Sequence, residues 1–216
     1  QHLFELTGAL RHDRYSDYGT STTPKLSFKW RAAPTFAFRG SYAEGFRAPG
    51  PAENGNSATA GFAGYLQVTS GNPDIKPEKA KSYNLGFVFE PTPSSSIVFD
   101  YYKVVRTNEI IGADGTLVVG PTQGTGTPLT TVPGQLPNSL IVYDENGDID
   151  AIFAPYINGG KTITHGFDVE AKQRVDLGEM GRVTGTVNWN HIRRFARIID
   201  GLAYEYAGTH GPFVLS

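Results

Sequence analysis

Residues 71–78 read G-N-P-D-I-K-P-E, and an alternating run, residues 82–90, follows closely. Pro73 and Pro77 restrict the backbone and keep the residues before them extended. The segment is therefore expected to lead a long loop into the start of a strand. Because successive side chains of a strand point to opposite faces, the run places its large apolar residues together on one face: Tyr83, Leu85, Phe87 and Phe89.

Similar period-two runs recur along the chain, whereas no stripe of apolar residues at the helical period competes with them. The residues at 24–32 show the alternation most clearly, with Leu26, Phe28 and Trp30 against Lys25, Ser27 and Lys29. Nine residues with a rise of about 3.3 Å and a tilt of about 40° span about 23 Å, close to the apolar thickness of a membrane. The alternation predicts seven strands, at about 3–12, 24–32, 35–43, 82–90, 96–110, 162–173 and 182–192.

The connections between these strands alternate between short and long. Residues 91–95 and 174–181 are short connections, whereas 44–79, 107–161 and 193–216 are expected to be long loops. Bacterial outer-membrane barrels have short periplasmic turns and long extracellular loops. The pattern predicts an all-β fold, an antiparallel up-and-down meander of about seven or more strands that forms part of a transmembrane β-barrel.

Composition excludes several other classes of protein. The net charge of −2 gives no electrostatic case for binding nucleic acid. The chain has no cysteine, which rules out disulfides and thiolate metal sites, and no run of 18 apolar residues that would form a transmembrane helix. Its 26 glycines and 12% aromatic residues, with only 39% hydrophobic residues, suit a barrel wall with one lipid-facing and one wetted face.

A resemblance to a known family rests on two motifs in collinear order. Residues 41–53, S-Y-A-E-G-F-R-A-P-G-P-A-E, and residues 71–78 resemble the paired signature of TonB-dependent outer-membrane receptors. In that family a strand ending in the first motif enters an extracellular loop, which returns to the membrane through the second. Further matching segments follow the family's order: 11–19, 99–106, 154–159, 165–170 and 207–211.

The sequence also departs from the family pattern. Family members carry a plug domain and a TonB-contacting segment before the barrel, and their barrels end in a strand with a terminal aromatic residue. Position 50 is Gly, where the family more often has Ser or Thr. From these departures the chain is expected to be an internal piece of the C-terminal half of a larger barrel.

The resemblance implies active uptake of a scarce ligand (ferric siderophore, haem, cobalamin or carbohydrate) across the outer membrane of a Gram-negative bacterium. The implied partners are outer-membrane lipid, the protein's own plug domain, the small-molecule ligand, and the inner-membrane TonB complex, which is reached through the N-terminal region. Two alternatives stay open: a passive porin-like barrel, which an odd strand count disfavours, and a soluble β-sandwich binding module, whose apolar faces would be buried against a second sheet.

Candidate site residues follow from position in the predicted meander. Aromatic residues in the expected loops are candidate ligand contacts: Phe62, Tyr65, Tyr156, Tyr204 and Tyr206. Polar residues on the face opposite the apolar one are candidates for facing the lumen or the plug: Arg39, Ser41, Asp100, Asp168, Glu170 and Asn188.

No catalytic residues, metal ligands or cofactor are predicted, and the chain is not expected to be an enzyme. The segment at 144–150, D-E-N-G-D-I-D, superficially resembles a calcium loop. However, Ile149 and Pro155 stand where an EF-hand needs Gly and Glu. Asn146-Gly147 between two apolar runs predicts a β-hairpin turn instead.

Overall fold

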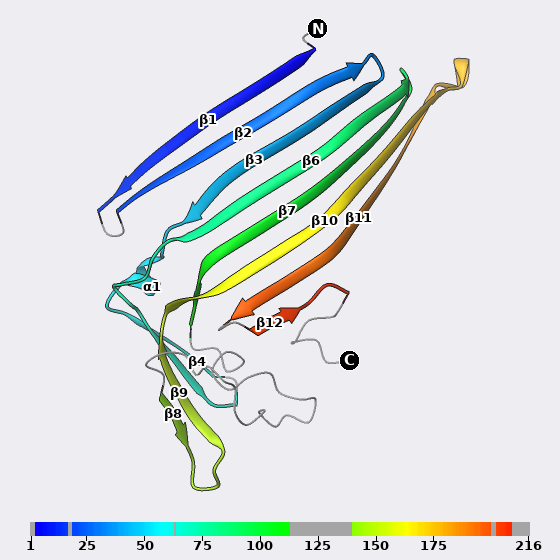
Figure 1. Cartoon of the computed structure of the whole chain (residues 1–216). Helices are drawn as coiled ribbons and strands as arrows, with labels where there is room; N and C mark the ends of the chain where they lie inside the picture. The colour runs from blue at the N-terminus through cyan, green and yellow to red at the C-terminus, as the bar shows by residue number, and fades with distance from the viewer. Residues whose placement is uncertain (1–2, 17–18, 63, 113–139, 200–201, 209–216) are drawn as a thin grey trace.

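The computed structural model of the chain describes residues 3–16, 19–62, 64–112, 140–199 and 202–208. Most of them belong to one broad, twisted antiparallel sheet of eight strands in the order β1-β2-β3-β6-β7-β10-β11-β12 (Figure 1). Its strands are β1 (Phe4–Tyr15), β2 (Gly19–Ala33), β3 (Phe36–Arg47), β6 (Glu78–Thr92), β7 (Ser95–Ile111), β10 (Ile157–Asp176), β11 (Arg182–Ile199) and β12 (Leu202–Glu205). The predicted antiparallel up-and-down meander is confirmed, because each strand pairs with the strand of this sheet that comes next along the chain.

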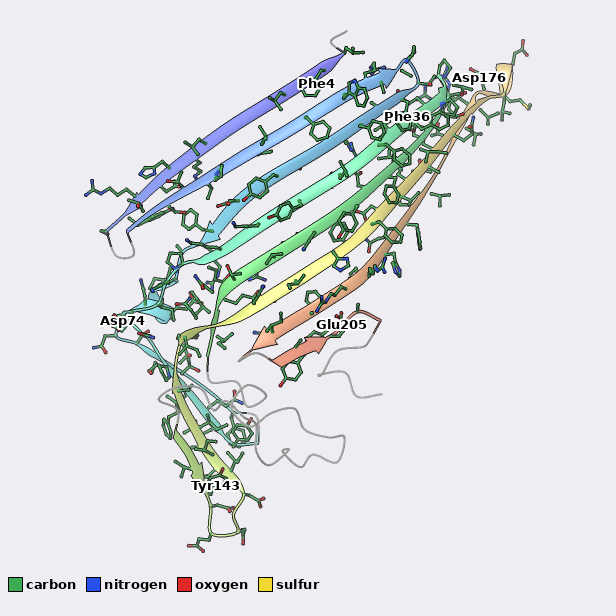
Figure 2. The ribbon with its side chains drawn as sticks, viewed as in Figure 1. Phe4, Phe36, Asp74, Tyr143, Asp176 and Glu205 are labelled. Carbon is green, nitrogen blue, oxygen red and sulfur yellow. The ribbon has the colours of Figure 1, made fainter. Side chains whose placement is uncertain are left out.

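One face of this sheet, here called the apolar face, carries rows of large hydrophobic side chains (Figure 2). Cross-strand pairing sets one such row, which runs over five strands: Phe4, Trp30, Phe38, Phe87 and Phe99. Two neighbouring pairs of this row stack their rings, with centroids 5.7 Å apart for Trp30–Phe38 and 5.5 Å apart for Phe87–Phe99. Trp30 is 44% exposed and Leu85, on the same face, is 55% exposed. A face this apolar and this uncovered suits lipid contact, as a barrel wall requires.

The opposite face, here called the polar face, carries charged and small residues in the same registers. One row crosses six strands at Lys29, Arg39, Gly86, Asp100, Asp168 and Asn190. The alternation read from the sequence therefore separates the two faces over most of the sheet. In β11 a register shift opposite His165 and Gly166 places Ile192 and Phe195 in polar-face registers.

The expectation that 44–79, 107–161 and 193–216 are entirely loops is wrong. β3, β7, β10 and β11 each extend several residues into these ranges, and β6 extends into the first of them by two residues. The apolar alternation ends where a strand leaves the apolar band, but the backbone ladder continues as long as the strands stay paired. In β7, which contains the strand predicted at 96–110, the register stays regular along 103–105 and shifts near Asn108, which has φ 55°.

The ranges 44–79 and 107–161 also contain a second sheet, of four strands in the order β4-β5-β9-β8. These strands are β4 (Ala58–Phe62), β5 (Leu66–Ser70), β8 (Leu140–Tyr143) and β9 (Ile149–Pro155). β5 and β9 pair in parallel, so segments far apart in sequence are joined directly. Ile111, Ile152 and Ala154 form the buried centre, and four partly buried residues pack against it: Tyr65, Ile141, Ile149 and Ile157. β4 and β5 were missed as strands because each is short and carries no long alternating run, whereas β8 and β9 are the two arms of the hairpin expected around Asn146-Gly147.

The predicted hairpin at 140–153 is confirmed, since β8 and β9 pair antiparallel around the turn. Asp144 Oδ1 accepts hydrogen bonds from the backbone N–H groups of Asn146, at 2.8 Å, and Asp148, at 2.9 Å. The N–H of Asp148, followed by that of Asn146, lowers the pKa of the Asp144 carboxyl. Gly147 has φ 86°, a conformation that favours glycine. This carboxylate therefore shapes a turn.

Helical structure is confined to two short segments of the described residues, α1 (Pro51–Asn54) and a 3₁₀ turn (Gly178–Met180). None of the helices in the described part of the chain is long and apolar enough to span a membrane.

Candidate functional site: the polar face and its loop end

An ionic network lies where the polar face meets the long connections. The first motif supplies Arg47, the last residue of β3, and Glu53 in α1, whereas the second motif supplies Glu78, the first residue of β6. Arg47 Nη1 lies 2.9 Å from Glu53 Oε2, and Arg47 Nη2 lies 2.8 Å from Glu78 Oε1. Glu53 Oε2 also accepts the Gly50 N–H at 2.6 Å. The two motifs are thus in direct ionic contact.

The network continues onto β7, β10 and β11. Arg106 Nη2 lies 3.1 Å from Glu78 Oε2, and Arg106 Nε lies 3.3 Å from Glu109 Oε1. Thr162 Oγ1 donates to Glu109 Oε2 at 2.8 Å, and Arg197 Nε lies 4.0 Å from that oxygen. We refer to Arg47, Glu53, Glu78, Arg106, Glu109 and Arg197 as the loop-end network.

Both central carboxylates of the loop-end network are buried, whereas the guanidinium groups around them are accessible. Glu78 and Glu109 are each 5% exposed, but the side chains of Arg47 and Arg106 are nearly half exposed. A buried charge is tolerated only when it is paired and hydrogen-bonded. Glu78 meets that condition with two arginines and the Ile110 N–H, which donates at 2.9 Å.

These contacts set the ionisation of Glu78, which lies beyond the apolar band. Burial alone would raise the pKa of this carboxyl. Hydrogen bonds from Arg47, the Ile110 N–H and Arg106 outweigh burial and lower the pKa to about 2. The same contact with Glu78, followed by that with Glu53, raises the pKa of Arg47. Glu78 is therefore fully ionised at neutral pH.

The remaining residues of the second motif are held by backbone and amide contacts. The Asn72 N–H donates to Glu53 O at 2.8 Å, and Asn72 Nδ2 donates to Tyr156 O at 2.8 Å. Ile75 is buried at 4% exposure. A Cβ at Gly71 would lie 1.9 Å from Gly55 O, so only glycine permits this close approach. Hydrogen bonds at Asn72, burial of Ile75 and the close backbone approach at Gly71 thus hold the second motif in place.

Asn158, at the start of β10, connects three segments at this end of the sheet. Its Oδ1 accepts the Lys76 N–H at 2.7 Å, and its Nδ2 donates to Lys76 O at 2.7 Å and Asn108 O at 2.9 Å. One amide side chain therefore satisfies the irregular backbone at Asn108 and fixes the second motif beside β7 and β10.

Further along the polar face, Arg39 and Asp100 form a two-point ion pair across the intervening strand β6. Arg39 Nε lies 3.0 Å from Asp100 Oδ1, and Arg39 Nη2 contacts Asp100 Oδ2. Gly86 occupies the same row between them, where a Cβ would lie 2.2 Å from Asp100 Oδ1. The absence of a side chain at Gly86 lets the two charges meet.

The structure places five of the six residues expected to face the lumen or the plug around one shallow hollow of about 510 Å³: Arg39, Asp100, Asp168, Glu170 and Asn188. Asn190 also lines it and hydrogen-bonds Asp168 through its Nδ2. The sixth residue, Ser41, lies on the same face, two residues along β3 from Arg39, and pairs with Ser27 and Asn84.

The five candidate ligand-contacting aromatics do not converge on one place. Phe62 ends β4 and is 79% exposed, whereas Tyr65 packs against the centre of the second sheet. Tyr156 links that sheet to β10, and its N–H donates to Ser70 O at 2.9 Å. Tyr204 pairs with Arg197 across β12 and β11, and the ring of Tyr206 lies 5.9 Å from that of Phe195.

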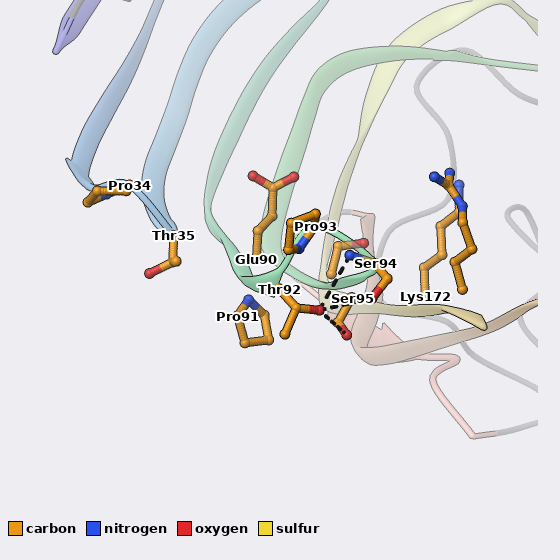
Figure 3. Close-up of a pocket in the computed structure, with 11 residues that line it drawn as sticks. Pro34, Thr35, Glu90, Pro91, Thr92, Pro93, Ser94, Ser95 and Lys172 are labelled. Atoms are coloured by element: carbon orange, nitrogen blue, oxygen red, sulfur yellow. Dashed lines mark hydrogen bonds between the residues drawn. The ribbon is translucent and has the colours of Figure 1, made fainter. Parts of the chain in front are cut away.

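A second hollow, of about 430 Å³, lies at the opposite end of the sheet, at the short turns (Figure 3). Charged side chains of the polar face reach it from β6 and β10: Glu90, Lys172 and Arg174. Thr92 Oγ1 lies 2.8 Å from Ser95 Oγ and accepts the Ser94 N–H at 3.3 Å, which fixes the turn between β6 and β7. Prolines of the turns line this hollow together with the charged side chains, so its surface is mixed.

The loop-end network was not predicted from the sequence as a site. The sequence does show that these arginines lie on the polar face, because Arg47 is an even number of residues from Arg39 and Arg106 is an even number from Asp100. Which carboxylate each arginine would meet depended on the cross-strand register, which local sequence does not reveal. Within the described residues, no group of three or more His, Cys, Asp or Glu side chains is arranged to hold a metal ion.

Comparison with known proteins agrees with this geometry. A family model described as "TonB dependent receptor-like, beta-barrel" matches residues 3–212. The siderophore receptor PirA from Acinetobacter baumannii superimposes with a TM-score of 0.61 at 16% identity, covering 90% of this chain and 28% of that one. A mutant of the ferric enterobactin receptor PfeA from Pseudomonas aeruginosa, in complex with enterobactin, gives a TM-score of 0.63 at 14% identity, covering 94% and 29%.

At such identities the likeness to these receptors shows the fold alone, and the chain spans less than a third of their length. A search of curated proteins by sequence gave no match. The family model, in contrast, matches nearly the whole chain. The chain therefore belongs to the TonB-dependent receptor-like β-barrel family.

Proposed function

We propose that the protein is an outer-membrane receptor of a Gram-negative bacterium that actively takes up a ferric siderophore. The observation that carries this proposal is the family match over residues 3–212, to which similar folds named as siderophore receptors add support. Members of this family are receptors and transporters, and no enzymatic step is proposed.

In this proposal the apolar face contacts outer-membrane lipid and the polar face lines the lumen. The hollow around Arg39, Asp100, Asp168 and Glu170 then contacts the plug domain, together with Ser41 and Asn188. Its three carboxylates and single arginine favour a basic segment of the plug. Energy for uptake comes from the inner-membrane TonB complex, which rearranges the plug and opens a path through the lumen.

The ligand approaches from the loop end. Tyr204 and Arg197 pair across β12 and β11, near the loop-end network. We propose that Tyr204 and Tyr206 contact the ligand there, and that Phe62, Tyr65 and Tyr156 contribute from the second sheet. Partly exposed guanidinium groups beside aromatic rings suit an anionic ligand that carries flat rings.

Uptake of radiolabelled iron by a strain that lacks the gene and is complemented with the full-length protein tests this function. Ferric enterobactin is the first probe, with haem and cyanocobalamin as contrasts. We expect accumulation of iron from the ferric siderophore, and we expect it to disappear when tonB is deleted. Uptake that persists without TonB would instead identify a passive porin, and no accumulation of any probe would contradict the proposal.

A further inference from the structure

The chain contains three Asn-Gly dipeptides, at residues 54–55, 146–147 and 158–159. This dipeptide is especially prone to spontaneous deamidation, because glycine has no side chain to keep its backbone nitrogen away from the preceding Asn side chain. The reaction still requires freedom, since the Asn side chain and the glycine nitrogen must both move before they can form a ring. The structure gives that freedom to the three sites very unequally.

Asn158 is firmly held through its side chain. Its amide group makes three hydrogen bonds, with the N–H and the O of Lys76 at 2.7 Å each and with Asn108 O at 2.9 Å. The following glycine is enclosed as well, because a Cβ at Gly159 would lie 2.7 Å from Ile111 Cδ1. Ring closure at this site would have to break all three hydrogen bonds inside packed surroundings.

The site at 54–55 is enclosed by backbone. Asn54 is the last residue of α1, and the Gly55 N–H donates to Pro51 O at 3.0 Å. A Cβ at Gly55 would lie 2.3 Å from that oxygen, and a Cβ at Gly71 would lie 1.9 Å from Gly55 O. The Gly55 nitrogen, which would have to attack, is therefore held between two closely packed segments.

The site at 146–147 is open by comparison. It lies in the turn of the β8–β9 hairpin, which extends away from the large sheet (Figure 1). Asn146 and Gly147 are both exposed, and a Cβ at Gly147 would meet no atom of the described chain within 4 Å, its sequence neighbours apart. Asn146 Nδ2 donates to Asp144 Oδ2 at a long 3.4 Å, and the Gly147 N–H donates to Asp144 O at 3.1 Å. Ring closure at this turn therefore breaks fewer strong hydrogen bonds than at Asn158 and displaces no packed neighbour.

We propose that Asn146 is a modification site, at which the side-chain amide is lost spontaneously and aspartate and isoaspartate form. This inference does not depend on the proposed function. The Gly147 nitrogen gives up its proton to water and bonds to Asn146 Cγ, while the Cγ–Nδ2 bond breaks and Nδ2 takes up a proton and leaves as ammonia. Water then opens the resulting succinimide ring.

The point at which water adds decides the product. Addition at Asn146 Cγ breaks the new Cγ–N bond and gives aspartate. Addition at the main-chain carbonyl carbon breaks the original peptide bond and gives isoaspartate, whose main chain runs through Cβ and Cγ. Either route consumes one water and releases one ammonia, and no oxidant or reductant is needed.

The modification would alter the turn that it occurs in. Both products add a negative charge beside Asp144 and Asp148, and isoaspartate also lengthens the main chain by one carbon. Asp144 Oδ1 accepts the N–H groups of Asn146 and Asp148, and these contacts require the present spacing of the backbone. Isoaspartate at this position is therefore expected to loosen the pairing of β8 with β9.

The test compares sites within one molecule. The full-length protein, purified in detergent, is incubated at mildly alkaline pH, which favours loss of the proton from the attacking nitrogen. Chymotrypsin then cuts after Tyr143, Phe153 and Tyr156. Asn146 and Asn158 therefore fall in separate peptides, and mass spectrometry follows each peptide with time. We expect the Asn146 peptide to gain about 1 Da, and the Asn158 peptide to do so roughly a hundredfold more slowly, because three hydrogen bonds must break first.

Denaturation and substitution supply the controls. In urea the Asn146 and Asn158 peptides should react at similar rates, because both carry the same dipeptide and neither is held. Asn54, in the chymotryptic peptide 47–62, should keep its mass in the folded protein. Asn146→Gln should remove the early gain, since the longer side chain would have to close a larger ring. Asp144→Ala frees the turn and should accelerate the gain in the Asn146 peptide.

Equal rates at Asn146 and Asn158 in the folded protein would overturn the inference, because the dipeptide alone would then set the reaction. So would an unchanged mass at Asn146 over a period in which the denatured protein reacts. The effect on the hairpin is read by limited proteolysis of the incubated protein. Wild type should become cleavable within 140–155 while Asn146→Gln stays protected, and equal protection of both would show that the modified turn still holds the hairpin.

Discussion

Glu78 joins the two sequence motifs through one buried carboxylate. It is 5% exposed and is contacted by Arg47, Arg106 and the Ile110 N–H. The net contribution of such an ion pair to stability can be small. Removing one partner is nevertheless strongly destabilising, because the other charged groups stay buried without compensation. The end of β3, the start of β6 and the end of β7 therefore depend on this side chain.

The substitution Glu78→Gln tests that dependence. Gln keeps the shape but removes the charge, so Arg47 and Arg106 lose a shared counter-ion. We expect a local destabilisation of about 3 kcal/mol, seen as faster hydrogen exchange of the Ile110 amide. Glu145→Gln removes the same charge from the exposed turn after β8 and should leave this exchange unchanged. Equal exchange in Glu78→Gln and wild type would mean that the carboxylate does not stabilise the loop end.

Acid should weaken the same contact within a defined pH window. The pKa of Glu78 is lowered from 4.5 to about 2. A lowered folded-state pKa contributes stability that is complete above the unfolded value of 4.5 and is lost as the pH falls through about 2. The shift corresponds to about 3 kcal/mol. The protection factor of the Ile110 amide should therefore fall across this window in the wild type. In Glu78→Gln it should stay flat, and a fall of equal size there would assign the effect to other groups.

At the scale of elements, the second sheet joins two long connections into one packed unit. β5 belongs to the first connection and β9 to the second, and they pair in parallel over five residues, Leu66 to Ser70 with Ala151 to Pro155. The buried centre draws Ile111 from the end of β7 and Ile152 from β9. The connections are thus expected to order together.

Ile152 and Phe153 provide a matched pair of neighbouring sites in β9. Ile152 is 0% exposed and Phe153 is 37% exposed. Ile152→Ala should cost about 2–5 kcal/mol, because it leaves a cavity in a small core. Phe153→Ala should cost much less. Limited proteolysis would show cleavage within 140–155 for Ile152→Ala while the large sheet stays intact. Similar cleavage in both variants would indicate that this sheet is not held by its core.

The sequence predicted the large sheet better than the second sheet, for a physical reason. Side-chain alternation reports which face of a strand is apolar, so residues 82–90 and 162–173 located β6 and β10. Alternation does not report how far the strand pairing continues once both faces of the sheet are in water. The start of β6 at Glu78, before the predicted residue 82, was missed for this reason. The parallel pairing of β5 with β9 joins segments that are far apart in the sequence, and no local pattern encodes it.

The same distinction applies to the candidate site. The parity of Arg39, Asp100 and Asp168 was enough to place them together on the polar face. The contact of Arg39 with Asp100 needed the register and the gap at Gly86. The loop-end network needed the register at both ends of β6. The local sequence determines on which face of a strand a side chain lies. Which residue that side chain contacts depends on how the strands are paired in the sheet.

At the scale of the whole molecule, the two faces of the wall must meet different media, and adjacent residues can distinguish them. Leu85, 55% exposed, pairs with Gly40 and Tyr101 on the apolar face, whereas Asn84 pairs with Ser41 and Tyr102 on the polar face. An arginine on the lipid side near the middle of the membrane costs about 2–4 kcal/mol, whereas the lumen side tolerates charge. Leu85→Arg should therefore reduce the amount of folded full-length protein in outer membranes, measured by its heat-modifiable mobility on gels. Asn84→Arg adds the same side chain one residue away and should assemble normally. If Asn84→Arg failed and Leu85→Arg assembled, the faces would be assigned the wrong way round. Equal assembly of both variants would mean that neither face of this sheet is in contact with lipid.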